Sequence, residues 1–217
     1  MEHNLLKLGD VLKLEPNVIA LGNFDGVHLG HQEVIKNAVS IAKEKGLKSC
    51  VLTFTPNPSA FFRPTEFKAL CDSKSRYNLI KHLDVDVLCE FEFNKELASL
   101  EPEEFVTKVL VDMLNVKHLI TGHNFKFGKG KTGDYRTLQD LSAKYNFKYS
   151  MVRQVSVLGY SVSSTLIRSL ISTSRVNLAA KLLGKFYSIG ATVIKGKGLA
   201  KSKLGFATAN LVPANDR

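Results

Sequence analysis

The stretch that decides the fold is VIALGNFDGVHLGH, which runs from Val18 to His31. Four apolar residues come first, and glycine, asparagine and aspartate then supply turn chemistry. His28 and His31 follow, and apolar residues recur at helical spacing from Val34 onward. Strand, glycine-rich turn and helix is the arrangement in which a helix N-terminus offers backbone N–H groups and a positive dipole end to a phosphate. The stretch therefore predicts a site for the phosphates of a nucleotide.

The rest of the chain alternates strand and helix patterns. Gly46 lies where a left-handed C-cap would end the first helix, and Pro102 lies where a later helix would begin. Residues 1–17 show only weak periodicity, so we expect an extended lead-in there. The expected strands are 18–21, 49–54, 85–91, 118–121 and 148–157, and the expected helices are 30–45, 73–83, 102–114, 134–145, 163–171 and 176–183.

This alternation predicts an α/β fold, with an open parallel sheet that carries helices on both faces. In such sheets ligands bind beyond the carboxyl ends of the strands. Three loops of interest follow strand ends, at residues 22–31, 122–133 and 159–165. We expect these loops, which are distant in sequence, to meet at one rim of the sheet.

The pattern changes after Gly184. Residues 187–194 and 206–211 are expected to be strands, and no helix signal appears. We therefore expect a domain of residues 1–184 followed by a segment of residues 185–217. That segment is shorter than the roughly 40 residues usually needed to fold alone.

Composition and charge narrow the class of partner. The chain has 217 residues, 44% hydrophobic and 23% charged, which is ordinary for a globular protein, and its formal net charge is +10. A basic balance suits nucleic acid, an acidic membrane surface or a polyphosphate metabolite. The lysines alternate with glycine rather than forming a continuous run. The alternative to an anionic partner is therefore that these lysines simply lie on a solvated surface.

Cysteine usage and hydropathy favour a cytoplasmic protein. Cys50, Cys71 and Cys89 lack CxxC spacing and lie in or near apolar runs, which indicates reduced core residues rather than structural zinc. The N-terminus does not have the basic and apolar regions of a signal peptide, and no apolar run is long enough to span a bilayer. We expect a soluble cytoplasmic protein that binds no membrane.

The histidine pair carries the first chemical signal. Imidazoles three residues apart at a helix start face the same side and can donate hydrogen bonds to phosphate oxygens, whether neutral or charged. Gly30, between them, would let a nucleotide approach the backbone closely. A metal site is the alternative, but the sequence offers no third ligand nearby. A purely structural role is the other alternative.

Residues 22–31 resemble the nucleotidyltransferase signature G-x-F-D-G-x-H-x-G-H. The run LGNFDGVHLGHQ is similar to the FMN adenylyltransferase (FAD synthetase) module of bacterial bifunctional riboflavin kinase/FMN adenylyltransferases. The resemblance implies an open Rossmann-like sheet of the nucleotidyltransferase superfamily and transfer of AMP from ATP to FMN with Mg²⁺. It further implies the following roles: catalytic contacts to the ATP phosphates by His28 and His31, and a nucleotide site shaped by Gly22, Asn23, Phe24, Asp25 and Gly30.

Two later motifs occur in the same order as in that family. GHNFKFG at residues 122–128 combines glycines, a lysine and two aromatic rings that could stack on a flat ligand, and two more lysines follow at 129 and 131; a mobile hairpin is the alternative. SSTLIR at residues 163–168 crowds hydroxyls at a helix N-terminus with an arginine one turn later; an ordinary N-cap is the alternative. The resemblance carries over these roles: flavin contacts by Asn124, Phe125 and Phe127, phosphate binding by Ser164 and Thr165, and a catalytic contact by Arg168.

A fourth motif, GFATAN at residues 205–210, resembles the riboflavin kinase signature G-F-P-T-A-N. The resemblance implies metal and phosphate binding by Thr208 and Asn210. Ala207 replaces the proline, and the sequence ends at Arg217, before the family's catalytic carboxylate. We therefore expect a short β segment of an incomplete riboflavin-kinase barrel, without kinase activity.

These observations favour FAD synthesis, with ATP and FMN as substrates and FAD as product. Another nucleotidyltransferase, acting on a pantetheine, nicotinamide or glycerol phosphate, is the nearest alternative, and a catalytically idle flavin-binding remnant is another. A nucleic-acid-binding protein is not expected, because the aromatic and basic residues form no recognisable RNA-binding module.

Overall fold

The computed structural model describes residues 1–11, 14–195, 205 and 208–213. Its centre is a six-stranded, all-parallel sheet with the strand order β1-β4-β3-β2-β5-β6. The strands of this sheet are β1 (Glu2–Leu6), β2 (Asn17–Leu21), β3 (Lys48–Thr55), β4 (Val87–Glu92), β5 (Val116–Gly122) and β6 (Lys148–Val152). The α/β class that the sequence predicts is confirmed.

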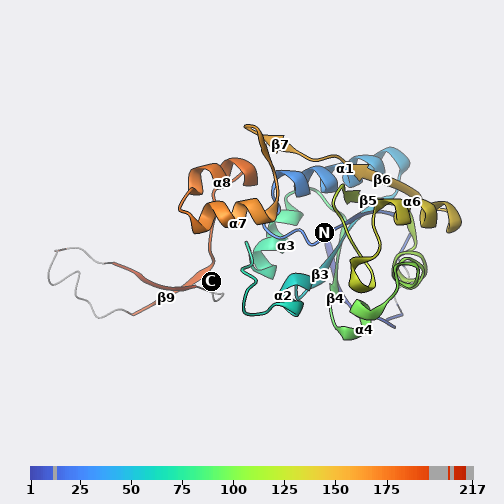
Figure 1. The fold of residues 1–217 in the computed structure, drawn as a ribbon, viewed down its shortest axis with the longest axis horizontal. Coiled ribbons are helices and arrows are strands. Elements are labelled where there is room, and N and C mark those ends of the chain that lie inside the picture. The colour runs from blue at the N-terminus through green and yellow to red at the C-terminus, as the bar shows by residue number, and fades with distance from the viewer. Residues whose placement is uncertain (12–13, 196–204, 206–207, 214–217) are drawn as a thin grey trace.

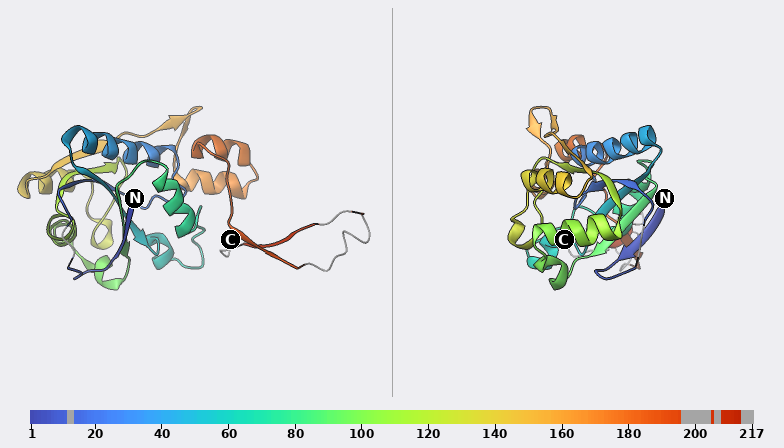
Figure 2. Two further views of the ribbon diagram at one scale, coloured as in Figure 1. Left: turned by 180° about the vertical axis from the view of Figure 1, so that it is seen from behind. Right: turned by 90° about the vertical axis from the view of Figure 1, so that its right-hand side faces the viewer.

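Helices cover both faces of the sheet (Figures 1 and 2). In chain order, the first five helices are α1 (Leu29–Lys45), α2 (Pro58–Phe62), α3 (Ser73–Lys81), α4 (Lys95–Ser99) and α5 (Pro102–Phe105). They are followed by the π-helix η1 (Val106–Met113), the 3-10 turn η2 (Lys129–Lys131), α6 (Tyr135–Lys144), α7 (Ser164–Ser172) and α8 (Val176–Leu183). None of the helices in the described ranges is both long and apolar enough to cross a membrane.

Two large apolar clusters lie on opposite faces of the sheet because successive side chains of a strand point to opposite sides. Ile19 and Leu52 pack against η1 and α6, whereas Val18 and Val51 pack against α1 and α3. A third, smaller cluster joins α7, α8 and Leu70. The parallel strands therefore end together at one edge, with helices on either side of it.

Three sequence expectations are corrected. Residues 1–17 are not a simple lead-in, because Glu2–Leu6 form the edge strand β1, paired in parallel with β4. The strand expected over 148–157 ends at Val152; Ser156–Val157 (β7) instead pairs with Tyr160–Ser161 (β8) around a turn with positive φ at both central residues. The helix expected over 102–114 is α5 continued as the wider η1.

The C-terminal strands lie apart from the main sheet. Ala191–Ile194 (β9) and Asn210–Pro213 (β10) form a two-stranded antiparallel ladder in which all eight residues are exposed. Figures 1 and 2 show this pair extending away from the α/β body. Part of the strand expected at 206–211 and Ala207 lie outside the described residues.

Candidate active site

The turn between β2 and α1 has an unusual backbone. Phe24 and Val27 have φ values of 46° and 44°, in the region that residues with a Cβ seldom occupy. Both side chains are 1% exposed, so burial in the core fixes them there. The strained conformation indicates a turn whose shape is determined by its surroundings.

The first helical turn of α1 brings the two histidines together. Nδ1 of His28 accepts the backbone N–H of His31 at 3.1 Å, and the two rings stack with centroids 3.6 Å apart. A Cβ on Gly30 would lie 3.2 Å from Cε1 of His28, so glycine leaves room for that ring. His28 is therefore both the N-cap of α1 and a wall of the site.

Burial keeps both imidazoles neutral. It lowers the pKa of His28 to about 4, and it holds the pKa of His31 well below the usual 6.5, with His28 and Arg168 adding to the effect. Because Nδ1 of His28 accepts a hydrogen bond, its proton belongs on Nε2, which is then a donor. Nδ1 of His31 is buried and has no hydrogen-bond partner among the described residues.

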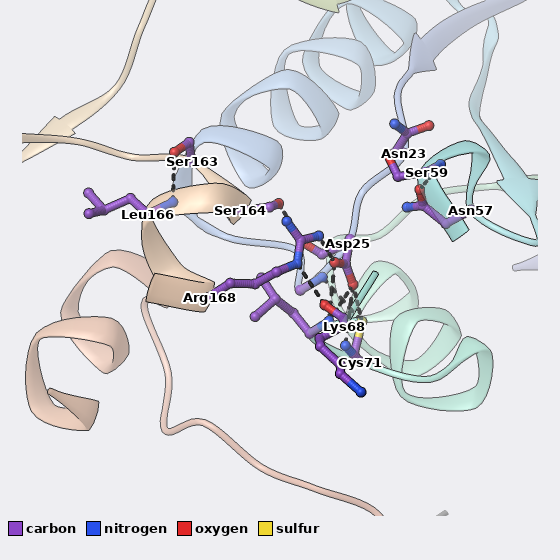
Figure 3. A network of polar contacts seen from close by, with 12 residues as sticks. Asn23, Asp25, Asn57, Ser59, Lys68, Cys71, Ser163, Ser164, Leu166 and Arg168 are labelled. Atoms are coloured by element: carbon purple, nitrogen blue, oxygen red, sulfur yellow. Dashed lines mark hydrogen bonds and ion pairs between the residues drawn. The ribbon is translucent and has the colours of Figure 1, made fainter. Parts of the chain in front are cut away.

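Asp25 is the centre of a polar network (Figure 3). Its carboxylate accepts the backbone N–H groups of Leu70 at 2.9 Å and Cys71 at 3.3 Å, and it pairs with Nη2 of Arg168. The Oγ of Ser164 donates to the Asp25 carbonyl at 3.0 Å. These contacts connect the turn after β2 with the start of α7.

Arg168 has two further contacts on the same segment. Its Nε donates to the Lys68 carbonyl at 2.7 Å, and its guanidinium lies 4.6 Å from the centroid of the Phe67 ring. Ser163 caps α7 by accepting the N–H of Leu166 at 3.2 Å, and Thr165 is exposed in the first turn. Contacts with Asp25, Lys68 and Phe67 therefore fix the orientation of the Arg168 side chain.

The loop after β5 is folded rather than an open hairpin. Phe127 forms a bridge with Gly133 and packs against Phe105 at a centroid distance of 5.8 Å. Phe125 lies parallel to Phe127 at 6.0 Å and is half-buried, whereas Asn124 is exposed. Phe127 is thus a core residue at the wall of the site, and Phe125 and Asn124 are more accessible.

One cleft of about 840 Å³ is lined by residues of all three loops. The rim that the sequence predicts is therefore present. Two groups of lining residues can be distinguished by their contacts. The first, here called the polar end, lies at the starts of α1 and α7 and comprises His28, His31, Ser163, Ser164, Thr165 and Arg168. The second, here called the aromatic end, is a connected set of rings comprising Phe54, Phe62, Phe93, Phe105, Phe125 and Phe127. Gly22, Asn23, Phe24, Asp25, Gly30 and Asn124 also line it.

Sequence reasoning missed much of the aromatic end. Phe62 and Phe93 follow the carboxyl ends of β3 and β4, the same edge from which the three predicted loops emerge. The rule that ligands bind beyond strand ends could have identified both. Arg63, Lys68 and Arg153 add positive charge to the lining and were also missed.

The kinase-like residues lie elsewhere. Thr208 is exposed and Asn210 lies on the exposed strand β10; neither lines the cleft. The structure therefore brings together the motifs at residues 22–31, 122–128 and 163–168. The described residues of the fourth motif, at 205–210, lie outside the site.

Comparison with known proteins agrees with this architecture. Residues 11–166 match the family model described as FAD synthetase. The chain belongs to the FAD synthetase family. The family match includes β2–β6, the histidine turn and the loop after β5, and it ends in the first turn of α7.

Relatives of the FAD synthetase family are longer than this chain. It is 34% identical over 214 residues to a bifunctional riboflavin kinase/FMN adenylyltransferase of Buchnera aphidicola, covering 96% of this chain and 66% of the relative. It is 40% identical over 198 residues to the protein of that name from Bacillus subtilis, covering 90% and 61%. A crystal structure of a macrolide-efflux protein from Streptococcus pneumoniae superposes with a TM-score of 0.88 at 28% identity, covering 99% of this chain and 70% of that one.

Proposed function

We propose that this chain transfers AMP from ATP to FMN, giving FAD and pyrophosphate. Membership of the FAD synthetase family supports the reaction. The observation that carries the proposal is the division of one cleft into a polar end, at the starts of α1 and α7, and an aromatic end beyond β3–β5. A nucleotide triphosphate suits the first end, and a flat, apolar isoalloxazine ring suits the second.

The proposed reaction is an in-line displacement at the α-phosphorus of ATP. A phosphate oxygen of FMN forms the new P–O bond, and the bond from the α-phosphorus to the oxygen bridging to the β-phosphate breaks, releasing pyrophosphate. The attacking phosphate is already anionic, so the site needs no strong base. The residues supply positioning and stabilisation of charge on the phosphates.

At the polar end, donors rather than acids are available. The triphosphate is proposed to bind at this end. Its ligands would be Nε2–H of neutral His28, the side chains of His31, Thr165 and Arg168, and the backbone N–H groups at the starts of α1 and α7. The hydroxyl of Ser164 is engaged with the Asp25 carbonyl, so we assign its contribution to the backbone at the start of α7. Preorganised donors of this kind stabilise developing charge without reorganising during the reaction.

At the aromatic end, the flavin is proposed to lie between β3, β4 and the loop after β5. Phe54 and Phe93 meet edge-on at 5.9 Å, and Phe62 contacts Phe93 at 5.8 Å while remaining 61% exposed. Phe125 and Asn124 complete this end of the cleft, where the amide can hydrogen-bond to a ring edge or a ribityl hydroxyl.

Mg²⁺ enters the proposal with the substrate, since phosphate oxygens are its usual ligands and it neutralises their charge. The described residues offer no group of three histidine, cysteine, aspartate or glutamate side chains for a metal, and the Asp25 carboxylate is committed to Arg168. The side chains in the described part of the chain do not form a complete Mg²⁺ site, so the ion would be held chiefly by the phosphates of the substrate.

We propose residues 1–184 as the adenylyltransferase domain and residues 185–217 as a riboflavin-kinase-like segment, with Thr208 and Asn210 as its former metal ligands. We expect no riboflavin phosphorylation, because Thr208 is exposed ahead of β10, Asn210 is exposed on β10, and neither residue lines the cleft. Three free cysteines support a reducing, cytoplasmic location. We propose no nucleic acid or membrane partner.

The test is product analysis of the purified chain with ATP, Mg²⁺ and one acceptor at a time. FAD and pyrophosphate should form from FMN, and riboflavin should be left unchanged. Parallel reactions with pantetheine, nicotinamide and glycerol phosphates should be inactive. Selective consumption of a non-flavin acceptor would overturn the proposal, and flavin binding without turnover would identify an idle remnant.

A further inference from the structure

The segment between α2 and α3, residues 63–71, has no regular structure and forms one side of the cleft. Arg63, Glu66, Phe67 and Lys68 all line it. Leu70 packs into the α7–α8 cluster. Most of the hydrogen bonds that hold the segment to the turn after β2 and to α7 involve the side chains of Asp25 and Arg168. One further hydrogen bond joins the Gly26 N–H to Sγ of Cys71 at 3.2 Å.

The Asp25 carboxylate holds two separate elements at once. It is 6% exposed and binds the N–H groups of Leu70 and Cys71, which fixes the end of the segment. It also pairs with Nη2 of Arg168, whose side chain is 26% exposed. A buried carboxylate needs several donors, so loss of one partner disturbs the others.

Arg168 is oriented by this arrangement. Nη2 binds Asp25, Nε binds the Lys68 carbonyl, and one face of the guanidinium lies against Phe67. Nη1 has no hydrogen-bond partner within the described ranges, and the side chain lines the cleft. The planar guanidinium is therefore fixed along one edge while another donor stays available.

We propose that Asp25 is a positioning residue that couples the two ends of the cleft. It orients Arg168 at the polar end. Through Arg168 and its own contacts with backbone N–H groups it also holds residues 66–71, in the segment that continues from Phe62 of α2, a ring of the aromatic end that contacts Phe93. This role rests on the proposed function, because it assigns a use to both ends of the same cleft. Asp25 itself need not touch either substrate.

The first test needs no ligand. Hydrogen exchange is measured over residues 63–72 in wild type, Asp25→Asn and Arg168→Lys. Backbone amides there should exchange at least about fivefold faster in each variant. Asp25→Asn removes the negative charge that pairs with Arg168, and Arg168→Lys removes the guanidinium that binds both Asp25 and the Lys68 carbonyl. Asp86→Asn is the matched control, since the Asp86 carboxylate accepts the Ser49 N–H at 2.8 Å, at the start of β3. It should leave residues 63–72 unchanged.

The second test separates positioning from stability. FMN affinity is followed by flavin fluorescence and FAD formation by kinetics, for both single variants and the double variant. Each single variant should lower kcat about tenfold and weaken FMN binding several-fold, and the double variant should be no worse than Arg168→Lys. If Asp25→Asn does not fold, Arg168→Lys alone should show both the exchange and the FMN effects.

Two results would overturn the coupling. One is wild-type exchange over residues 63–72 in folded variants, and the other is multiplication of the two kinetic losses in the double variant. Should the wild type make no FAD, the proposed function fails separately, and the exchange and FMN-binding data still decide the role of Asp25.

Discussion

At the scale of single residues, the stacked His28 and His31 rings narrow the chemistry of the site. The sequence allows either charge state, whereas burial in the folded protein keeps both imidazoles neutral near pH 7. A neutral ring with Nδ1 occupied presents one defined donor, which suits a phosphate oxygen and requires no proton transfer.

Removal of one imidazole should affect turnover far more than folding. His31→Ala is expected to lower kcat for FAD formation about 10²- to 10³-fold, the usual effect of losing one preorganised donor. His82→Ala is the matched control, because His82 is exposed at the end of α3 and does not line the cleft. Near wild-type FAD formation by folded His31→Ala would refute the assigned role.

The lowered histidine pKa also predicts a pH dependence of stability. Native His28 is protonated only near pH 4, whereas the unfolded chain is protonated near 6.5, so the unfolded state binds more protons in between. The free energy of unfolding should therefore fall as pH drops from 6.5 to 4, by about 3 kcal/mol from this group. Denaturant unfolding of His28→Gln should show a shallower decline than wild type; an equal decline would contradict the prediction.

At the scale of elements, helix ends place the site residues. His28, Asp134 and Ser163 cap α1, α6 and α7 with side-chain acceptors, and α8 ends at Gly184 with φ 71°. The end of α8 contacts the first turn of α1 directly, because Nε2 of Gln32 donates to the Leu183 carbonyl at 3.1 Å. The stability of α8 is thus connected to the polar end of the cleft.

Two C-cap glycines make a matched pair for testing this connection. A Cβ at Gly184 would lie 2.6 Å from Cδ2 of Leu29, whereas a Cβ at Gly46 has nothing within 4 Å. Gly46→Ala should lower the free energy of unfolding by about 1 kcal/mol, because alanine is strained in the left-handed backbone conformation of this residue. Gly184→Ala should cost more and should also weaken ATP binding, measured by calorimetry. Equal effects of the two substitutions on both quantities would disprove the connection.

Local signals explain which elements the sequence could predict. The start of α1, the caps at Gly46 and Gly184, and the existence of the interior strands follow from turn chemistry and apolar spacing. β1 was missed because a half-exposed edge strand has little pattern and depends on pairing with β4, more than 80 residues away. The end of β6 was missed because the hairpin β7–β8 continues the same strand-like composition.

The candidate site shows the same division. The histidine and serine-threonine loops were predictable because their motifs are local and follow strand ends. The partners of Asp25 were not, because Leu70 and Arg168 lie 45 and 143 residues along the chain. Phe127 lines the cleft and also packs against Phe105, a contact that the local motif could not predict.

At the scale of the whole molecule, the three apolar clusters contain buried residues between Leu6 and Leu183 only, among the described residues. Beyond them, Tyr187 still packs against the α7–α8 cluster, and β9 and β10 are exposed. The main body therefore does not depend on the terminal ladder for its core.

A shortened chain tests that division. Residues 1–188 should unfold within a few degrees of the full chain in thermal melts and should form FAD at a similar rate, because the cleft and all three clusters remain. Retaining residues 185–188 keeps Tyr187 in place. Aggregation of the shortened protein, or loss of turnover with the fold intact, would show that the last segment supports the site.

Because the cleft lies at the carboxyl ends of the parallel strands, the amino ends, on the opposite side of the sheet, are suitable for chemical attachment. Exposed Lys48, Lys117 and Lys148 mark the beginnings of β3, β5 and β6 on that side. A dye or a solid support attached through a cysteine introduced at one of these positions would therefore leave the entrance to the cleft open to solution. Surface-based measurements of flavin and nucleotide capture could then use an oriented protein layer.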